Sequence, residues 1–139
     1  MAQPESQDET SAPHIRNEGI RPLSGQKAIV TGANSGIGRA VAIELGAAGA
    51  DVVVNYVADE PAADEVVELI RAAGSDAVAC KCDVSSEGDV TEMFRRAIAS
   101  FGRIDILVNN AGLQRDAAFQ DMTLQHWNTV IGVNLTGQF

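Results

Sequence analysis

The chain has 139 residues, of which 45% are hydrophobic, so it is long enough and apolar enough to fold as one domain with a core. A formal net charge of -9 argues against nucleic acid as a partner, because an acidic surface repels phosphate groups. No apolar run reaches the roughly 18 residues of a membrane helix, and the first residues lack the pattern of a secretory leader. We therefore expect no membrane partner and a cytoplasmic protein.

Residues 1–23 are polar, contain prolines and lack hydrophobic periodicity, which predicts a flexible polar arm. A regular pattern begins after them. Short apolar runs predict strands over residues 27–31, 51–55, 77–82 and 104–108. Apolar side chains at helical spacing lie between and after these runs, over residues 37–48, 66–73, 90–101 and 124–134. Ser86 with Asp89, and Thr123, predict N-terminal caps for the last two helices.

Strands that alternate with helices predict βαβ units. We therefore expect an α/β fold over residues 24–139: a doubly wound parallel sheet of Rossmann type, with strand order 3-2-1-4. The chain ends after the helix that follows the fourth strand, so we expect this domain to be truncated there and incomplete at its C-terminus. Cys80 and Cys82 lie too close along one strand for a normal disulfide, which predicts two reduced core cysteines.

A glycine-rich loop follows the first predicted strand and leads directly into a helix. Gly32 permits a tight turn, Gly36 lets the backbone approach a pyrophosphate, and Gly38 lets the helix pack close to the strand. The N-terminus of the helix then presents N–H groups to the phosphates. An ordinary glycine-rich turn is the alternative. The loop residues that we expect to bind a dinucleotide are Gly32, Asn34, Ser35, Gly36, Ile37 and Gly38.

The carboxyl end of the second predicted strand is expected beside the adenosine ribose, where an acidic residue favours NAD. Asp51 opens this strand at the opposite edge, so we interpret it as a solvated strand start. Asn55 and Tyr56 stand at the carboxyl end, and we assign both to the cofactor site. An uncharged Asn55 neither repels nor attracts a 2′-phosphate, so the predicted cofactor is NAD or NADP.

Polar residues also follow the fourth predicted strand. The segment from Asn109 to Gly112 places two amides and a glycine there, which is typical of a close cofactor approach and equally of an ordinary turn. Asn134 lies on the apolar face that Leu124, Trp127 and Ile131 form on the last predicted helix. A buried amide needs hydrogen-bond partners. Asn134 therefore either belongs to a capped or kinked helix end or points into a site.

Together these motifs resemble the short-chain dehydrogenase/reductase family, over residues 23–139. Residues 31–38 resemble its TGxxxGxG loop, residues 83–84 its adenine-side aspartate, residues 109–112 its NNAG element, and Asn134 its helix asparagine. The resemblance implies that Asn134 is catalytic and holds a water in a proton relay. The further cofactor-binding residues that it implies are Asp83, Val84, Asn110, Ala111 and Gly112. Within the family, residues 52–56, 109–113 and 127–139 look like bacterial glucose 1-dehydrogenases.

The resemblance implies hydride transfer between a nicotinamide ring and a small alcohol or carbonyl substrate, with a sugar such as glucose as a candidate, in a homo-oligomeric full-length enzyme. The family's general base is a tyrosine whose pKa is lowered by a lysine four residues later. Tyr56 is the only tyrosine here, and Glu60 stands where that lysine would be. We therefore expect these 139 residues alone to be inactive. The alternative is a non-catalytic dinucleotide-binding fragment from a truncated gene.

Overall fold

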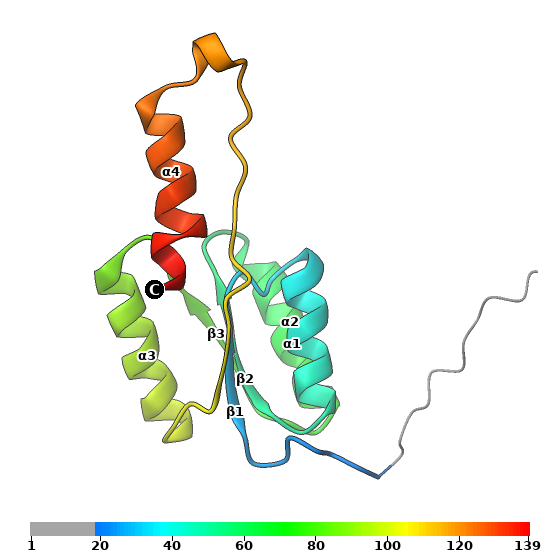
Figure 1. The fold of residues 1–139 in the computed structure, drawn as a ribbon. Helices are drawn as coiled ribbons and strands as arrows, with labels where there is room; N and C mark the ends of the chain where they lie inside the picture. Colours follow the sequence, from blue (N-terminus) through cyan, green and yellow to red (C-terminus); the bar gives the residue numbers. More distant parts are fainter. Residues whose placement is uncertain (1–18) are drawn as a thin grey trace, which may run out of the picture.

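The computed structural model describes residues 19–139, in which four strands form a single sheet (Figure 1). The strands are β1 (Lys27–Val30), β2 (Asp51–Tyr56), β3 (Ala77–Lys81) and β4 (Ile106–Val108). They lie in the order β3-β2-β1-β4, and every neighbouring pair is parallel. The predicted doubly wound parallel sheet and its strand order are confirmed.

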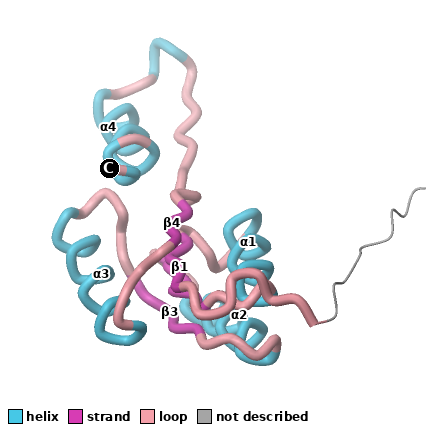
Figure 2. Tube along the Cα trace, turned by 60° about the horizontal axis from the view of Figure 1, so that its bottom comes forward, coloured by secondary structure: helices cyan, strands magenta, loops and turns pink. Residues whose placement is uncertain are grey.

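Among the described residues, four α-helices accompany this sheet, and three of them cover its faces. The four helices are α1 (Gly36–Ala47), α2 (Glu60–Ala72), α3 (Glu87–Phe101) and α4 (Leu124–Asn134). Helices α1 and α2 lie on one face and α3 lies on the other (Figure 2). Helix α4 lies beyond the carboxyl ends of the strands, after an extended segment (Figure 1). Two short 3₁₀ turns, Phe119–Asp121 and Thr136–Gln138, flank α4. No helix among residues 19–139 is both long and apolar enough to cross a bilayer.

The core consists of two apolar layers, one on each face of the sheet. Val52 and Val54 pack toward α1 and α2, whereas Val53 packs toward α3, as alternation along a strand requires. Because both faces of a parallel sheet are covered, β2 is apolar at consecutive positions. Cys80 and Cys82 are free and buried in the α3 layer, which confirms the predicted reduced core cysteines. Burial raises the pKa of the Cys82 thiol to about 11.

The N-terminal boundary differs from the prediction. Residues 1–18 of the predicted flexible arm lie outside the described residues. Arg21 and Leu23, which we also assigned to the arm, instead belong to the folded body. The Arg21 guanidinium donates to the Ser75 hydroxyl over 2.6 Å, and the Leu23 N–H donates to the Ala48 carbonyl over 2.9 Å. Polar bonds to residues far along the chain hold this segment, so hydrophobic periodicity does not reveal it.

The predicted helix caps are both present. The Ser86 hydroxyl accepts from the Asp89 N–H over 3.3 Å at the start of α3. The Asp89 carboxylate accepts from the Ser86 hydroxyl and from the Asp83 N–H, both over 3.1 Å, and so connects the start of α3 to the turn after β3. At α4, the Thr123 hydroxyl accepts from the His126 N–H, and His126 Nδ1 accepts from the Thr123 N–H, which completes a capping box.

Candidate functional site

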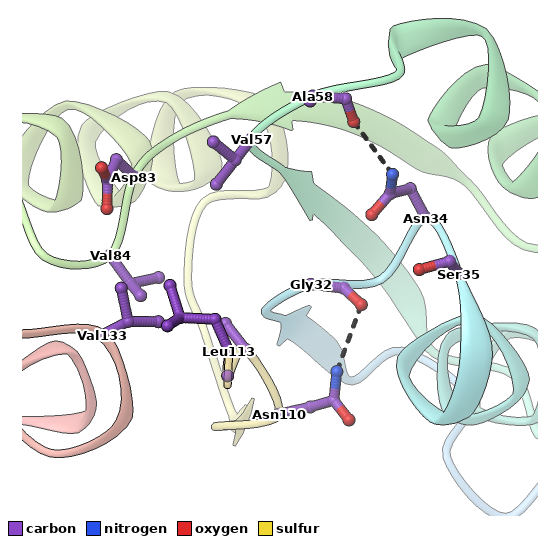
Figure 3. A pocket seen from close by; sticks show the side chains of 12 residues that line it. Gly32, Asn34, Ser35, Val57, Ala58, Asp83, Val84, Asn110, Leu113 and Val133 are labelled. Atoms are coloured by element: carbon purple, nitrogen blue, oxygen red, sulfur yellow. Dashed lines mark hydrogen bonds between the residues drawn. The ribbon is translucent and has the colours of Figure 1, made fainter. Parts of the chain in front are cut away.

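A cavity of about 450 Å³ lies at the carboxyl ends of the strands (Figure 3), where a doubly wound sheet binds its ligand. Loops after all four strands line it. The lining residues that the sequence predicted are Gly32, Asn34, Ser35, Asp83, Val84, Asn110, Ala111 and Gly112. The lining residues that it missed are Val57, Ala58, Leu113 and Val133. Val57 and Ala58 directly follow β2, so the rule that ligands lie beyond strand ends could have identified them.

The glycine loop has a backbone that suits an anion. Gly32 and Gly36 have φ values of 61° and 54°, in the left-handed region that glycine adopts without strain. Ser35 precedes α1 without making a side-chain cap, and the first turn of α1 contains no acidic residue. The N–H groups of that turn therefore remain available to a phosphate. Gly36, Ile37 and Gly38 do not line the cavity themselves, and the Ile37 side chain is exposed.

Gly38 and Asn110 join the glycine loop to the turn after β4. A Cβ built on Gly38 would fall inside van der Waals contact with the Gly32 carbonyl oxygen and with Asn110 Nδ2. The close approach that requires glycine is therefore to the loop and to Asn110, and not to the strand as predicted. Asn110 Nδ2 donates to the carbonyl oxygens of Thr31, over 2.8 Å, and Gly32, over 3.1 Å (Figure 3). The Asn110 side chain therefore fixes the backbone of Gly32, which lines the cavity.

Thr31 organises the same turn, although the sequence indicated it only as the end of a strand and the first residue of the glycine motif. Its buried hydroxyl donates to the Val108 carbonyl oxygen over 3.3 Å. The Thr31 hydroxyl oxygen in turn accepts from the N–H groups of Asn110 and Ala111, both over 2.9 Å. All the hydrogen-bonding capacity of the hydroxyl is used, which fixes the turn after β4 against the end of β1. The signal that could have identified this role of Thr31 is a hydroxyl side chain directly after an apolar strand.

The residues at the end of β2 are arranged differently from the prediction. The Asn55 side chain is completely buried, and Oδ1 accepts from the Gly32 N–H over 3.0 Å. The interpretation that this side chain faces the ribose is therefore wrong. Tyr56 is also buried and packs into the α1 and α2 layer. Asn55 and Tyr56 do not line the cavity, because the strand ends before the chain reaches it at Val57 and Ala58.

Two hydrogen-bonded side chains hold opposite sides of the cavity (Figure 3). On one side, Asn34 Nδ2 donates to the Ala58 carbonyl oxygen over 2.9 Å and joins the glycine loop to the segment after β2. On the other side, Asp83 Oδ1 accepts from the N–H and the hydroxyl of Ser85, over 2.9 and 2.7 Å. These bonds fix the direction of the Asp83 carboxylate, which among residues 19–139 is the one acidic side chain that lines the cavity.

Asn134 lies beside this cavity and lines a second, smaller one of about 290 Å³. Its Nδ2 donates to the Leu113 carbonyl oxygen and its Oδ1 accepts from the Leu113 N–H, both over 2.9 Å. Asn134 is the last residue of α4, and its amide holds the segment that follows Gly112. The remaining residues of the smaller cavity are Leu113, Gln114, Arg115, Asp116, Met122, His126, Trp127 and Val130. The catalytic role of Asn134 stays a prediction.

The larger cavity is built to bind a ligand, and its lining offers little for proton transfer. Asp83 is engaged by Ser85, and the other lining side chains that the structure describes do not ionise near neutral pH. Tyr56 cannot serve as the general base either. Burial and the neighbouring Glu60 carboxylate raise the pKa of the Tyr56 hydroxyl, whereas a general base needs its pKa lowered toward neutrality.

The sheet topology, the glycine loop and the position of the cavity define a nucleotide-binding domain of Rossmann type. The sequence profile of the short chain dehydrogenase family matches residues 26–139. The chain therefore belongs to the short-chain dehydrogenase family, a family of oxidoreductases, as the motifs indicated.

Two curated relatives carry the name 3-oxoacyl-acyl-carrier-protein reductase. The protein of Synechocystis sp. is 46% identical over 117 residues, which are 84% of this chain and 47% of the relative. The protein of Staphylococcus aureus strain Mu50 is 42% identical over 114 residues, which are 82% of this chain and 46% of the relative. The chain spans about half the length of these relatives.

Two solved structures show the same fold. A short chain dehydrogenase from Burkholderia cenocepacia J2315 in complex with NADP superposes with a TM-score of 0.80 at 39% identity, covering 83% of this chain and 47% of that one. A short chain dehydrogenase from Mycobacterium avium superposes with a TM-score of 0.79 at 39% identity, covering 84% of this chain and 43% of that one.

Proposed function

We propose that this chain forms the cofactor-binding half of an oxidoreductase that uses NAD or NADP to transfer hydride between nicotinamide and an alcohol or carbonyl substrate. The observation that carries the proposal is the cavity at the strand ends, beside a helix N-terminus with no side-chain cap. Its volume of about 450 Å³ is in the range of cofactor sites. The NADP bound to the Burkholderia relative supports the same class of ligand.

The residues present fit such a cofactor. The glycine loop, residues 32–38, would hold the pyrophosphate, since its left-handed glycines leave the backbone open to close approach. Residues 57–58 and 83–84 would enclose the adenosine, and residues 110–113 would border the nicotinamide. When bound, the nicotinamide supplies or accepts the hydride. The chain's own residues bind and orient the cofactor.

For the substrate, we propose a 3-oxoacyl thioester. The names of the Synechocystis and Staphylococcus relatives support this class of carbonyl compound. The glucose expected from the sequence has no such support among them. The test is an assay of the full-length protein that contains this chain, with acetoacetyl thioester and NADPH in one arm and glucose with NAD or NADP in the other. Faster oxidation of glucose than reduction of the thioester would contradict the proposed substrate.

A second candidate is a dinucleotide-binding fragment without activity of its own. The observation that favours it is the raised pKa of Tyr56 in a chain that lacks a tyrosine–lysine pair. Both candidates require the same cofactor site, and only the first predicts that substrate is converted. We also propose that the full-length form is a homo-oligomer, since Leu124, Trp127 and Leu135 expose large apolar side chains on and just after α4.

The cofactor site is tested by titrating the 139-residue chain with NADPH and following the fluorescence of the cofactor. We expect saturable binding that Gly36→Asp weakens at least tenfold, because the substitution places a carboxylate at the phosphate loop and a side chain at a φ of 54°. Gly88→Asp is the matched control, since a Cβ at Gly88 in α3 meets nothing within 4 Å. No binding by the unaltered chain, or equal binding by the two variants, would overturn the proposal.

A further inference from the structure

The Asn55 amide occupies a position where the pattern of β2 favours an apolar side chain. The strand reads DVVVNY, and alternation places Asn55 on the same face as Val53, in the layer that α3 covers. The side chain is completely buried. Buried amides persist where hydrogen bonds satisfy them, so the partners of this one indicate what it does.

Every polar atom of the Asn55 side chain is paired. Oδ1 accepts from the Gly32 N–H over 3.0 Å. Nδ2 donates to the carbonyl oxygens of Cys82, over 3.0 Å, and Cys80, over 3.3 Å. A primary amide has two N–H groups, and both have an acceptor here. A single side chain on β2 therefore ties the loop after β1 to the end of β3.

These partners adjoin the wall of the cofactor cavity. Gly32 lines the cavity, and Cys82 directly precedes Asp83, which lines its other side. The Asn55 carbonyl oxygen also accepts from the Ala33 N–H over 2.8 Å, so the glycine loop is attached at two successive residues. The end of β3 is attached to β2 in the same way, because the Cys82 N–H donates to the Tyr56 carbonyl oxygen over 2.9 Å. The Asn55 side chain adds to these main-chain bonds a single group that contacts both the glycine loop and the end of β3.

We infer that Asn55 is a positioning residue of the cofactor site, which sets the affinity for the adenosine half of the dinucleotide by fixing the glycine loop against the turn after β3. The inference rests on the proposed function. Asn55 itself lies behind the cavity wall and acts through Gly32 and Asp83. Thr31 and Asn110 hold the nicotinamide side without any bond to the Asn55 side chain. The effect of Asn55 should therefore be confined to one end of the cofactor.

Two variants separate the bonds of the amide. Asn55→Asp keeps the shape and the acceptor for the Gly32 N–H, but it removes both donors and directs an oxygen at the carbonyls of Cys80 and Cys82. Asn55→Leu removes every bond at similar volume. Val53→Ala is the matched control, because Val53 is buried on the same strand and face but does not contact the cavity.

The measurement is the Kd of each folded variant for adenosine 2′,5′-bisphosphate and for nicotinamide mononucleotide, at submicromolar chain and at a temperature where circular dichroism shows native helix content. We expect both Asn55 variants to bind the bisphosphate at least tenfold more weakly and the mononucleotide within twofold of the unaltered chain. Val53→Ala should leave both constants within twofold. Equal loss of the two ligands in an Asn55 variant, no loss, or the same loss in Val53→Ala would overturn the inference.

A second measurement needs no variant and therefore does not depend on the folding of a substituted core. In the unaltered chain without ligand, hydrogen exchange followed by mass spectrometry should show a protected Gly32 N–H, because the Asn55 oxygen accepts it before any cofactor binds. Exchange of Gly32 as fast as an exposed loop would overturn the inference. Failure of the unaltered chain to bind NADPH would overturn the proposed function and this inference with it, whereas normal binding with no Asn55 effect would overturn the inference alone.

Discussion

Replacement of Gly38 by alanine is the sharpest probe of how the glycine loop is assembled. Gly38 is the third residue of α1, a position where alanine normally stabilises a helix by roughly 0.5–1 kcal/mol relative to glycine. Here a Cβ would meet the Gly32 carbonyl oxygen and Asn110 Nδ2 inside contact distance, and would lie 3.0 Å from the Gly32 carbonyl carbon. Two of these atoms are backbone, so a rotamer change cannot relieve the clash.

The expected magnitude follows from these opposing effects. Overpacking a close contact costs about 1–3 kcal/mol, and this outweighs the gain in helix propensity. The clash also separates the Asn110 amide from the Gly32 carbonyl, a bond of 3.1 Å. We therefore expect Gly38→Ala to lower the free energy of unfolding by roughly 1–3 kcal/mol and the Tm by roughly 4–12 °C. NADPH affinity should fall with it, since both partners line the cavity.

The assay is thermal and urea unfolding followed by circular dichroism, combined with NADPH titration of the folded variant. Gly88→Ala serves as the control, because Gly88 lies in the first turn of α3 and a Cβ there meets nothing within 4 Å. That control should be as stable as the unaltered chain or slightly more stable. If Gly38→Ala melted at or above the Tm of Gly88→Ala and bound NADPH normally, the packing argument would be refuted.

Three further expectations concern pH, cofactor choice and turnover. Burial opposes ionisation of Asp51, but the Lys27 ammonium and a main-chain N–H lower the pKa of this carboxyl below its ordinary 3.8. The stability that the Lys27–Asp51 pair contributes is therefore present above about pH 4 and is lost as the pH falls through the folded-state pKa. Asp51→Asn should therefore flatten the fall in Tm below about pH 4, and an unchanged acid slope would count against the pairing. The full-length enzyme should discriminate between NAD and NADP by less than roughly a thousandfold in kcat/KM, which is about 4 kcal/mol. The reason is that the uncharged Ser35 and Val57 border the cavity, and a larger ratio would contradict this expectation. The 139-residue chain should show no turnover with any alcohol or sugar, because the pKa of its one tyrosine, Tyr56, is raised. Cofactor-dependent turnover above that of the Gly36→Asp variant would disprove this expectation.

Hydrophobic pattern was sufficient to predict the sheet, because parallel strands buried on both faces leave continuous apolar runs in the sequence. Element ends were less predictable. Helix α2 begins at Glu60, whereas its apolar spacing starts at Val66, because the Asp59 side chain accepts from the Ala62 N–H over 3.2 Å and starts the helix in a polar segment. Strand β4 begins at residue 106 and not at residue 104, since Asp105 uses its carboxylate to accept from the Lys27 N–H.

The site was predictable as a set of loops but not as a set of side-chain directions. The glycine spacing indicated Gly32, Asn34 and Ser35, and the family resemblance added residues 83–84 and 110–112, all of which line the cavity. That they bind a cofactor stays a prediction. The bonds of Asn55 reach residues 23 to 27 positions away, and those of Asn134 reach residue 113, so no local pattern shows them. Alternation places Asn55 on a face of β2, but both faces of this strand are buried, and alternation therefore cannot distinguish a cavity from a core.

The apolar surface around β4 and α4 leads to a last prediction, that the 139-residue chain associates with itself. Within the part of the chain that the structure describes, strand β4 is paired on one side only, with β1, and Leu107 on it is 46% exposed. Trp127 and Leu124 on α4 are 58% and 73% exposed. An unpaired strand edge can pair with another chain, and exposed apolar patches associate in water. The net charge of -9 opposes association only partly, because salt screens it beyond roughly 8 Å.

Sedimentation velocity at micromolar concentration tests this prediction, with Trp127→Gln as a variant that removes apolar surface from α4. We expect concentration-dependent species larger than a monomer for the unaltered chain, with less association for the variant. Salt should increase association by screening the charge, whereas a contact held by ion pairs would weaken in salt. A monomer at every concentration, together with a cooperative melt, would mean that the charge and the small size of β4 protect this edge, and that the exposed side chains of α4 do not associate on their own.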